Sequence, residues 1–208
     1  MNYKLEKEAA IESSGSTSGR ITKTGAYVGT FTRAEAIESQ YGTKGIEFSF
    51  TADNGDTADR LQVWTMKSNG DRIFGFNLIM GLMTCVKARE INKTSGFVQK
   101  FDYISGQQKT MQAEIYPALM NKDIGVILQA EEYIYNGETK QRMVVVNFFE
   151  AATELMAKEI LEGTKEPEMM QKLVSRLPEV KKAKESKPNN ADGMGVVGVS
   201  FEDSDIPF

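Results

Sequence analysis

The sequence predicts a mainly β protein in which five antiparallel strands carry one helix between the third strand and the fourth. Two observations predict the strands: apolar and polar residues alternate over short segments, and sequences with strong turn propensity separate those segments. A third observation predicts the helix, because the longest apolar run, Ile73 to Val86, suits a short buried helix. That run contains Asn77 and is too short to cross a bilayer, so we expect no membrane association.

The strands are expected at residues 20–32, 46–50, 61–66, 125–135 and 141–149. The first is rich in β-branched and aromatic residues, and the second places two phenylalanines on one face. Turns rich in Asn, Asp and Gly separate strands or lead into the helix, at residues 53–56, 68–71 and 136–137. The side chains expected to build the core are Phe48, Phe50, Phe74, Phe76, Phe148 and Phe149.

The chain is expected to divide into four parts. Residues 1–19 hold a Ser/Gly cluster and should form a flexible N-terminal arm. Residues 20–150 have the element order of an OB-fold, a five-stranded antiparallel Greek-key barrel, although another small β-barrel fits the periodicity equally well. Residues 151–178 should form a helical extension of two amphipathic segments, the first beginning at Glu150 and the second ending before Pro178. Residues 179–208 should form a disordered linker and an acidic tail.

Composition argues against most kinds of catalytic site. The chain has no histidine and one cysteine, which removes Ser–His and Cys–His nucleophile pairs and the usual zinc ligand sets. Cys85 lies in the apolar run, where a buried, inert thiol is expected. The carboxylates of Asp53, Asp56 and Asp59 are the remaining candidates for a metal, but their glycine-containing hairpin favours a role in the turn. We therefore expect no enzyme activity, no cofactor and no metal.

Charge is unevenly distributed along the chain. The formal net charge is −4, yet the segment from Arg60 to Lys109 has eight basic and three acidic residues, a local balance of +5. The acidic average therefore does not exclude a nucleic-acid partner. The single cysteine and the charged N-terminus, which does not resemble a secretory signal, are typical of a cytoplasmic protein.

Basic and aromatic residues are interleaved between Arg60 and Lys109. Most of them lie within a long polar connection expected at residues 87–110. Sequence-tolerant binding of single strands needs cations along the phosphates and flat rings that stack on the bases. The connection supplies Lys87, Arg89, Lys93, Phe97, Lys100, Phe101, Tyr103 and Lys109. Further candidate rings are Tyr27, Tyr41 and Trp64, for which packing within the protein is the alternative. Further candidate phosphate contacts are Arg33, Lys44, Lys67 and Arg72, for which ordinary solvated charges are the alternative.

The acidic tail has a composition suited to capture by another protein. Acidic residues are followed by two apolar side chains that a proline holds apart, and the candidate partner-binding residues are Asp203, Asp205, Ile206, Pro207 and Phe208. The acids can steer the tail to a basic rim, and the phenylalanine can fill an apolar pocket. This segment resembles the C-terminal tip of bacterial single-stranded DNA-binding proteins (SSB), in which an acidic run precedes Ile-Pro-Phe, although Ser204 interrupts the run here.

A second resemblance covers about residues 20–150. The organisation GAYVGTFTRAE, GTKGIEFSF and NGDTADRLQVWTMKSNGD is similar to that of SSBs encoded by some bacteriophages. The resemblance implies an OB-fold that coats single-stranded DNA in replication, recombination or repair in the cytoplasm of the bacterial host. It also implies that the tail recruits partner enzymes. The alternatives are a recruitment adaptor with weak DNA binding and a metal-dependent nuclease or accessory subunit. The sequence leaves open whether the protein is a homo-oligomer.

Overall fold

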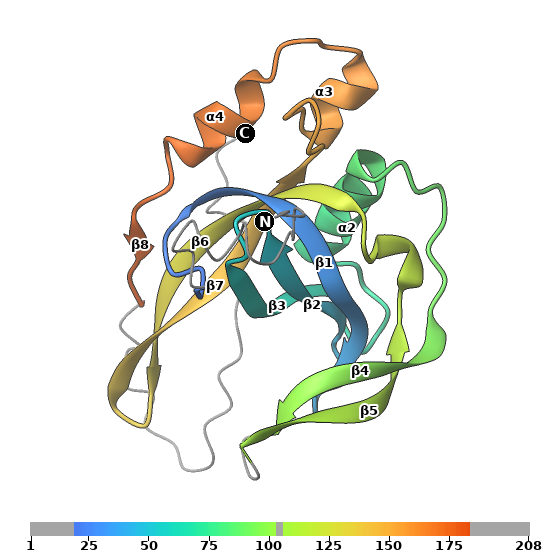
Figure 1. Cartoon of the computed structure of the whole chain (residues 1–208), viewed down its shortest axis with the longest axis vertical. Helices are drawn as coiled ribbons and strands as arrows, with labels where there is room; N and C mark the ends of the chain where they lie inside the picture. Colours follow the sequence, from blue (N-terminus) through green and yellow to red (C-terminus); the bar gives the residue numbers. More distant parts are fainter. Residues whose placement is uncertain (1–18, 103–105, 184–208) are drawn as a thin grey trace, which may run out of the picture.

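The structure of the protein, a computed structural model, describes residues 19–102 and 106–183 (Figure 1). It is mainly β: seven strands pair in antiparallel fashion, and a two-residue strand is added in parallel. The strands are β1 (Gly25–Glu38), β2 (Lys44–Ala52), β3 (Thr57–Met66), β4 (Thr94–Asp102), β5 (Gln107–Ile115), β6 (Asp123–Tyr135), β7 (Glu138–Phe149) and β8 (Val180–Lys181). The helices are α2 (Phe74–Cys85), α3 (Ala157–Glu162) and α4 (Glu168–Val174), with a 3-10 turn, η1, at Pro117–Leu119.

The sheet is organised around β1. The first part of this strand pairs with β6, and nearly all of its later part pairs with β2. A bulge between Phe31 and Arg33 shifts the register against β2, and Figure 1 shows β1 curving across the molecule. Beyond this ladder, β2 pairs with β3, β6 pairs with β7, and β3 also contacts β7. Strands β1, β2, β3, β6 and β7 therefore surround a common interior.

Phenylalanine rings fill this interior, as the sequence predicts. The ring centroid of Phe31 lies 4.5 Å from that of Phe48 and 6.0 Å from that of Phe148, and all three side chains are fully buried. Burial of each ring stabilises the fold by about 2–3 kcal/mol. Phe50 and Phe149 are buried as expected, whereas the two phenylalanines of α2, Phe74 and Phe76, are only partly buried.

The prediction that residues 87–110 connect the helix to the next strand without strands of their own is wrong. Strands β4 and β5 occupy most of it and form a hairpin from Thr94 opposite Ile115 to Asp102 opposite Gln107. The apolar alternation that reveals a half-buried strand is missing here, because Val98 is the sole buried side chain described in the hairpin. The count of five strands is therefore too low, and β8 lies where only a linker was predicted.

The C-terminal helices are shorter than predicted. The segment 150–156 is a turn and an extended stretch, and α3 begins only at Ala157, while α4 covers Glu168–Val174 of the second predicted helix. None of the helices within the described residues has the length and apolar character needed to cross a membrane. The predicted N-terminal arm up to residue 18 and the tail from residue 184 lie outside the described residues.

Glu159 joins these two short helices. Its side chain is buried, with 4% of the residue's surface exposed. One carboxylate oxygen accepts the backbone N–H of Met156 at 2.9 Å, and the other accepts those of Glu168 and Met169, both at 2.9 Å. Backbone N–H groups at helix starts have no partner within the helix, so a single carboxylate satisfies three of them.

We expect Glu159→Ala to lower the free energy of unfolding by about 2–3 kcal/mol, because it leaves buried N–H groups without acceptors. Chemical denaturation measures this loss. Glu162→Ala is the control. Glu162 is exposed and its ion pair with Lys158 is long, at 3.9 Å, so loss of this side chain should lower the free energy of unfolding by less than about 0.5 kcal/mol. Equal effects of the two substitutions would contradict the role assigned to Glu159.

Candidate nucleic-acid interface

Strands β1, β2 and β3 present a polar face on the side of the sheet that points away from the phenylalanine core. On β3, Leu61 and Val63 point into the core, so Gln62 and Trp64 lie on the opposite face. We call this the outer face and define it by Arg33, Glu35, Glu47, Ser49, Gln62 and Trp64. Two of the predicted contact residues, Arg33 and Trp64, lie on this face.

Arg33 lies at the centre of the outer face, and all three of its guanidinium nitrogens have partners. Nη1 donates to Glu35 Oε2 at 2.8 Å, Nη2 donates to Glu47 Oε1 at 2.7 Å, and Nε donates to Ser49 Oγ at 3.1 Å. Its side chain is only 9% exposed. Arg33 is largely buried and its charge is balanced by two carboxylates of the protein, which is not the setting of a cation that is free to contact a phosphate.

The network continues in both directions from Arg33. On β3, Gln62 Nε2 donates to Glu47 Oε2 at 2.9 Å, and on β4, Lys100 Nζ lies 2.6 Å from Glu35 Oε1. The network thus joins β3, β2, β1 and β4, with two cations balancing two carboxylates. The backbone ladder between β1 and β5 contains a single pair, Glu35 opposite Ile115. The Lys100–Glu35 ion pair therefore helps to attach the β4–β5 hairpin to the sheet.

A second group of predicted residues meets at the end of the outer face where β1 turns into β2. Lys44 is paired across the ladder with Met66, next to Lys67, and Met66 forms a bridge with Arg72. A Cβ atom placed on Gly42 would lie 2.9 Å from Ser68 Cβ, which shows that the β1–β2 and β3–α2 turns touch. The structure therefore brings together what we call the end cluster: Tyr41, Lys44, Trp64, Lys67 and Arg72.

The side chains of the end cluster are largely available to a ligand. Tyr41 is 66% exposed, and Lys44, Lys67 and Arg72 are exposed. Among the described residues, no carboxylate lies within ion-pair distance of Lys44 or Lys67. The guanidinium carbon of Arg72 lies 4.2 Å from the ring centroid of Phe76, which holds this cation over an aromatic face.

Trp64 is held against the backbone of β2. A Cβ on Gly45 would lie 3.0 Å from Cε3 of the indole and 2.6 Å from the carbonyl oxygen of Val63. Glycine at position 45 thus allows β3 and the tryptophan ring to approach β2 closely. The indole is partly exposed, so it retains surface on which a base can stack.

The β4–β5 hairpin carries the next set of predicted residues, which do not form one surface. Phe97 is 77% exposed and lies on the strand face opposite Lys100. Lys93 Nζ lies 3.8 Å from Glu114 Oε2, and Lys109 is exposed and paired across the ladder with Lys100. The side chain of Phe101 and the whole of Tyr103 lie outside what the structure describes.

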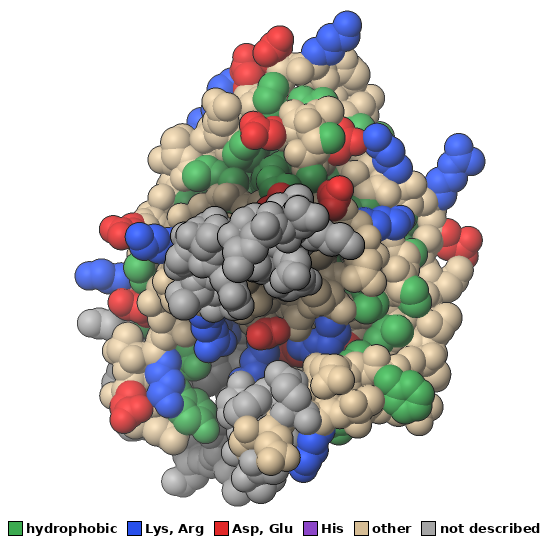
Figure 2. Space-filling view, in the orientation of Figure 1, with side chains coloured by type: hydrophobic (Ala, Val, Ile, Leu, Met, Phe, Trp, Pro, Cys, Tyr) green, Lys and Arg blue, Asp and Glu red, His purple; other side chains and the backbone are tan. Residues whose placement is uncertain are grey.

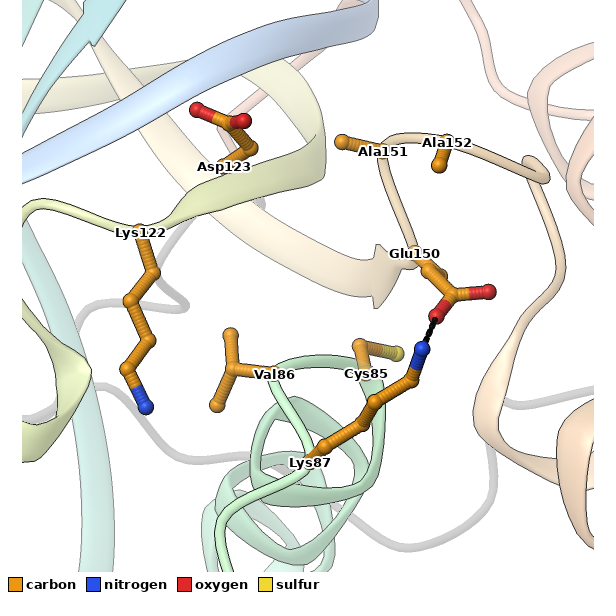
Figure 3. A pocket seen from close by; sticks show the side chains of 8 residues that line it. All are labelled: Cys85, Val86, Lys87, Lys122, Asp123, Glu150, Ala151 and Ala152. Carbon is orange, nitrogen blue, oxygen red and sulfur yellow. Dashed lines mark ion pairs between the residues drawn. The ribbon is translucent and has the colours of Figure 1, made fainter.

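Lys87 and Arg89 lie apart from the other predicted residues, beyond the C-terminal end of α2. Lys87 Nζ is 2.8 Å from Glu150 Oε1 at the rim of a shallow hollow of about 200 Å³ (Figure 3). The hydrogen bond from Lys87 lowers the pKa of Glu150. Burial raises the pKa of Cys85, which lines the same hollow, to about 12, so its thiol stays protonated at neutral pH. The expectation of a buried and inert cysteine agrees with this geometry.

Tyr27 packs within the protein, which is the alternative to base stacking for this ring. Its ring packs against the main core and is partly buried, and its hydroxyl donates to the carbonyl oxygen of Lys23 at 2.7 Å. Burial raises the pKa of this hydroxyl. Tyr27 and Trp64 are both partly exposed, and of the two it is Tyr27 that packs against the main core, whereas Tyr41 is 66% exposed.

The sequence does not reveal the carboxylates and the amide of the outer face as part of the candidate site, because the usual sequence sign of a nucleic-acid site is basic residues. Sequence reasoning also missed the end of the β6–β7 hairpin. There, Lys140 Nζ lies 4.8 Å from the ring centroid of Tyr135, and the guanidinium carbon of Arg142 lies 5.4 Å from that of Tyr133. The signal was present in the sequence as Tyr, Lys and Arg spaced on either side of the Asn136-Gly137 turn.

Cations and carboxylates are mixed on the face of the molecule that Figure 2 shows. Figure 2 shows basic and acidic side chains next to each other below the middle of the face, rather than a continuous basic surface. In the described part of the chain, no group of three or more acidic or cysteine side chains could hold a metal ion. Asp56, a candidate ligand, instead accepts the backbone N–H of Gly19 at 2.8 Å and the side-chain amide of Asn54 at 2.8 Å.

No protein-family model matches the chain, and no curated protein has a significantly similar sequence. The proposed function therefore rests on the residues and geometry described above and on the resemblance seen in the sequence. The tail residues Asp203, Asp205, Ile206, Pro207 and Phe208 lie outside the described residues.

We expect Arg33→Met to lower the free energy of unfolding by about 3–5 kcal/mol, because two largely buried carboxylates lose their central partner. Chemical denaturation of the variant measures the loss. Arg142→Met is the control, since Arg142 is one-third exposed and pairs with Glu131 at 2.8 Å, so its loss should cost about 1 kcal/mol or less. A loss for Arg33→Met no larger than that of the control would contradict the central position of Arg33.

Proposed function

We propose that the protein binds single-stranded DNA through the end cluster and the adjoining outer face. The observation that carries this proposal is the end cluster, in which lysines with no carboxylate partner among the described residues lie beside one exposed and one partly exposed aromatic ring. Cations beside flat rings are what a sequence-tolerant single-strand site needs, since the cations contact phosphates and each stacked base contributes roughly 1–3 kcal/mol. The function requires binding alone and no catalytic chemistry.

We further propose that the five enclosing strands form an OB-fold. In support, β1 pairs with both β2 and β6, β3 pairs with β2 and contacts β7, and α2 lies between β3 and β6 in the chain. The β4–β5 hairpin is then an insertion after the helix. In OB-folds the face formed by the second and third strands commonly binds oligonucleotides, and the outer face contains the corresponding β2 and β3.

The resemblance to phage and bacterial SSBs leads to the biological part of the proposal. The protein would coat single strands in phage replication, recombination or repair, in the cytoplasm of the bacterial host where these strands arise. Binding single strands in preference to duplex shifts the melting equilibrium of hairpins by mass action. The acidic tail would recruit replication and repair enzymes to the coated strand, and this role rests on its sequence alone.

A recruitment adaptor with weak DNA binding is the second candidate. The observation that favours it is the pairing of Arg33, Lys87, Lys93 and Lys100 with carboxylates, which leaves fewer cations for phosphates than the sequence suggests. Each candidate predicts a different affinity for single strands, so a direct binding measurement separates them.

Fluorescence anisotropy of labelled oligo-dT and of a matched duplex, measured over a range of salt concentrations, tests the proposed function. We expect oligo-dT to bind more tightly than the duplex, and Lys44→Gln/Lys67→Gln to weaken binding. The double substitution should also reduce the slope of log K against log salt by about 1.4, the value for two lost phosphate contacts on a single strand.

Lys158→Gln/Lys165→Gln is the control, because it removes the same charge from exposed positions in and after α3. If both double variants change the slope equally, the lysines of the end cluster are not specific phosphate contacts. If the wild-type protein binds neither oligonucleotide, the adaptor becomes the better explanation.

Removal of the tail by truncation after Asn190 is expected to raise the affinity for oligo-dT at low salt and to have no effect at high salt. The reason is that the removed acids compete with DNA for the same cations, and salt screens this competition. Ile206→Ala/Phe208→Ala retains the acids and should bind oligo-dT like the full chain. Unchanged affinity of the truncated protein at low salt would contradict contact between the tail and the interface.

A further inference from the structure

Gln62 and Trp64 lie next to each other on the outer face, and their arrangement bears on which bases can bind there. They are two residues apart on β3, so their side chains project from the same face about 6–7 Å from each other. Gln62 is exposed and Trp64 partly exposed, whereas the residues between and before them are buried. A base stacked on Trp64 would therefore place one of its edges near the Gln62 amide.

The orientation of the Gln62 amide is determined by its neighbour. Glu47 Oε2 accepts from the Gln62 nitrogen Nε2 at 2.9 Å, and Glu47 Oε1 accepts from Arg33 Nη2 at 2.7 Å. A carboxylate oxygen accepts hydrogen bonds, so it selects the NH₂ side of the amide. The carbonyl oxygen of Gln62 consequently points away from Glu47.

The Gln62 carbonyl is available as an acceptor. No donor among the described residues is paired with it. Glu47 is held by Arg33, which is itself held by Glu35 and Ser49, so rotation of the amide would break a bond to a fixed partner. The polar surface beside Trp64 therefore presents two acceptor groups, the Gln62 carbonyl and the Glu47 carboxylate, against the one N–H of the Gln62 amide that does not bond to Glu47.

The bases differ in what they offer to such a surface. Cytosine, adenine and guanine each carry an exocyclic amino group that can donate to an acceptor. Thymine has a carbonyl oxygen at the position of the cytosine amino group, and its single N3–H lies between two carbonyl oxygens. An acceptor near this edge thus gains a hydrogen bond from an amino base and faces carbonyl oxygens on thymine.

We infer that Gln62, oriented by Glu47, makes the base position at Trp64 favour bases with an exocyclic amino group over thymine. This inference rests on the proposed single-strand binding and adds a specificity determinant to it. Gln62 is the residue that touches the base, and Glu47 is a positioning residue. One hydrogen bond of this kind changes affinity by about fivefold.

Competition between two oligonucleotides that differ only in the relevant groups tests the inference. Oligomers of 5-methyl-dC and of dT share the ring size and the methyl group and differ at positions N3 and 4, so base stacking is closely matched. At mildly alkaline pH, where cytosine N3 is unprotonated, we expect the wild-type protein to bind the 5-methyl-dC oligomer about fivefold more tightly per preferred position.

Variants of the two side chains distinguish recognition from general binding. Gln62→Leu should remove the preference, measured as the ratio of the affinities for the two oligomers, and Gln171→Leu, at an exposed position of α4, should retain that ratio. Glu47→Gln should reduce the preference, because its amide no longer selects one orientation of Gln62, and a thermal melt checks that this variant is folded.

The outcomes separate the inference from the function on which it rests. Binding of both oligomers with equal affinity, or a preference that survives Gln62→Leu, would overturn the base discrimination and leave single-strand binding intact. Failure of the wild-type protein to bind either oligomer would overturn the proposed function and the inference together.

Discussion

The guanidinium of Arg33 is the group on which the outer face depends. It lies just after the β1 bulge, which turns it away from the phenylalanine core, and it holds one carboxylate on its own strand and another on β2. Through these two acids it fixes Gln62 on β3 and Lys100 on β4. A buried ion pair is stabilising only when its geometry compensates for the loss of water, and here every guanidinium nitrogen has an acceptor.

The charge balance of this network limits how strongly the outer face can attract phosphates. Because two cations balance two carboxylates, the centre of the face is electrically neutral and cannot supply the main attraction for phosphates. In the proposed single-strand binding, that attraction comes from the end cluster, where no carboxylate of the described residues lies within ion-pair distance of Lys44 or Lys67. The neutral centre instead supplies fixed hydrogen-bonding groups beside Trp64, so attraction and base contact are assigned to neighbouring but different residues.

Much of the fold follows from the sequence, because the alternation in β2 and β3 and the Asn-Gly turns are local signals. The buried positions of Phe48, Phe50, Phe148 and Phe149 follow from the same patterns. The β4–β5 hairpin does not, since it buries one described side chain and is attached through an ion pair between residues 65 positions apart. For the candidate site, residue type predicts Tyr41, Lys44, Trp64, Lys67 and Arg72, and their contact with DNA stays a prediction. The pairing of Arg33 and Lys100 with carboxylates depends on strand register, which composition does not reveal.

The most direct test of this account uses Trp64, the protein's one tryptophan. Selective excitation of its indole reports on the outer face alone while an oligonucleotide is added. If bases stack on this ring, oligo-dT will quench the fluorescence strongly, and the quenching will saturate at the same DNA concentration as the anisotropy of the labelled strand. Tight binding seen by anisotropy, with the tryptophan fluorescence unchanged, would show that DNA binds elsewhere and would contradict the site described here.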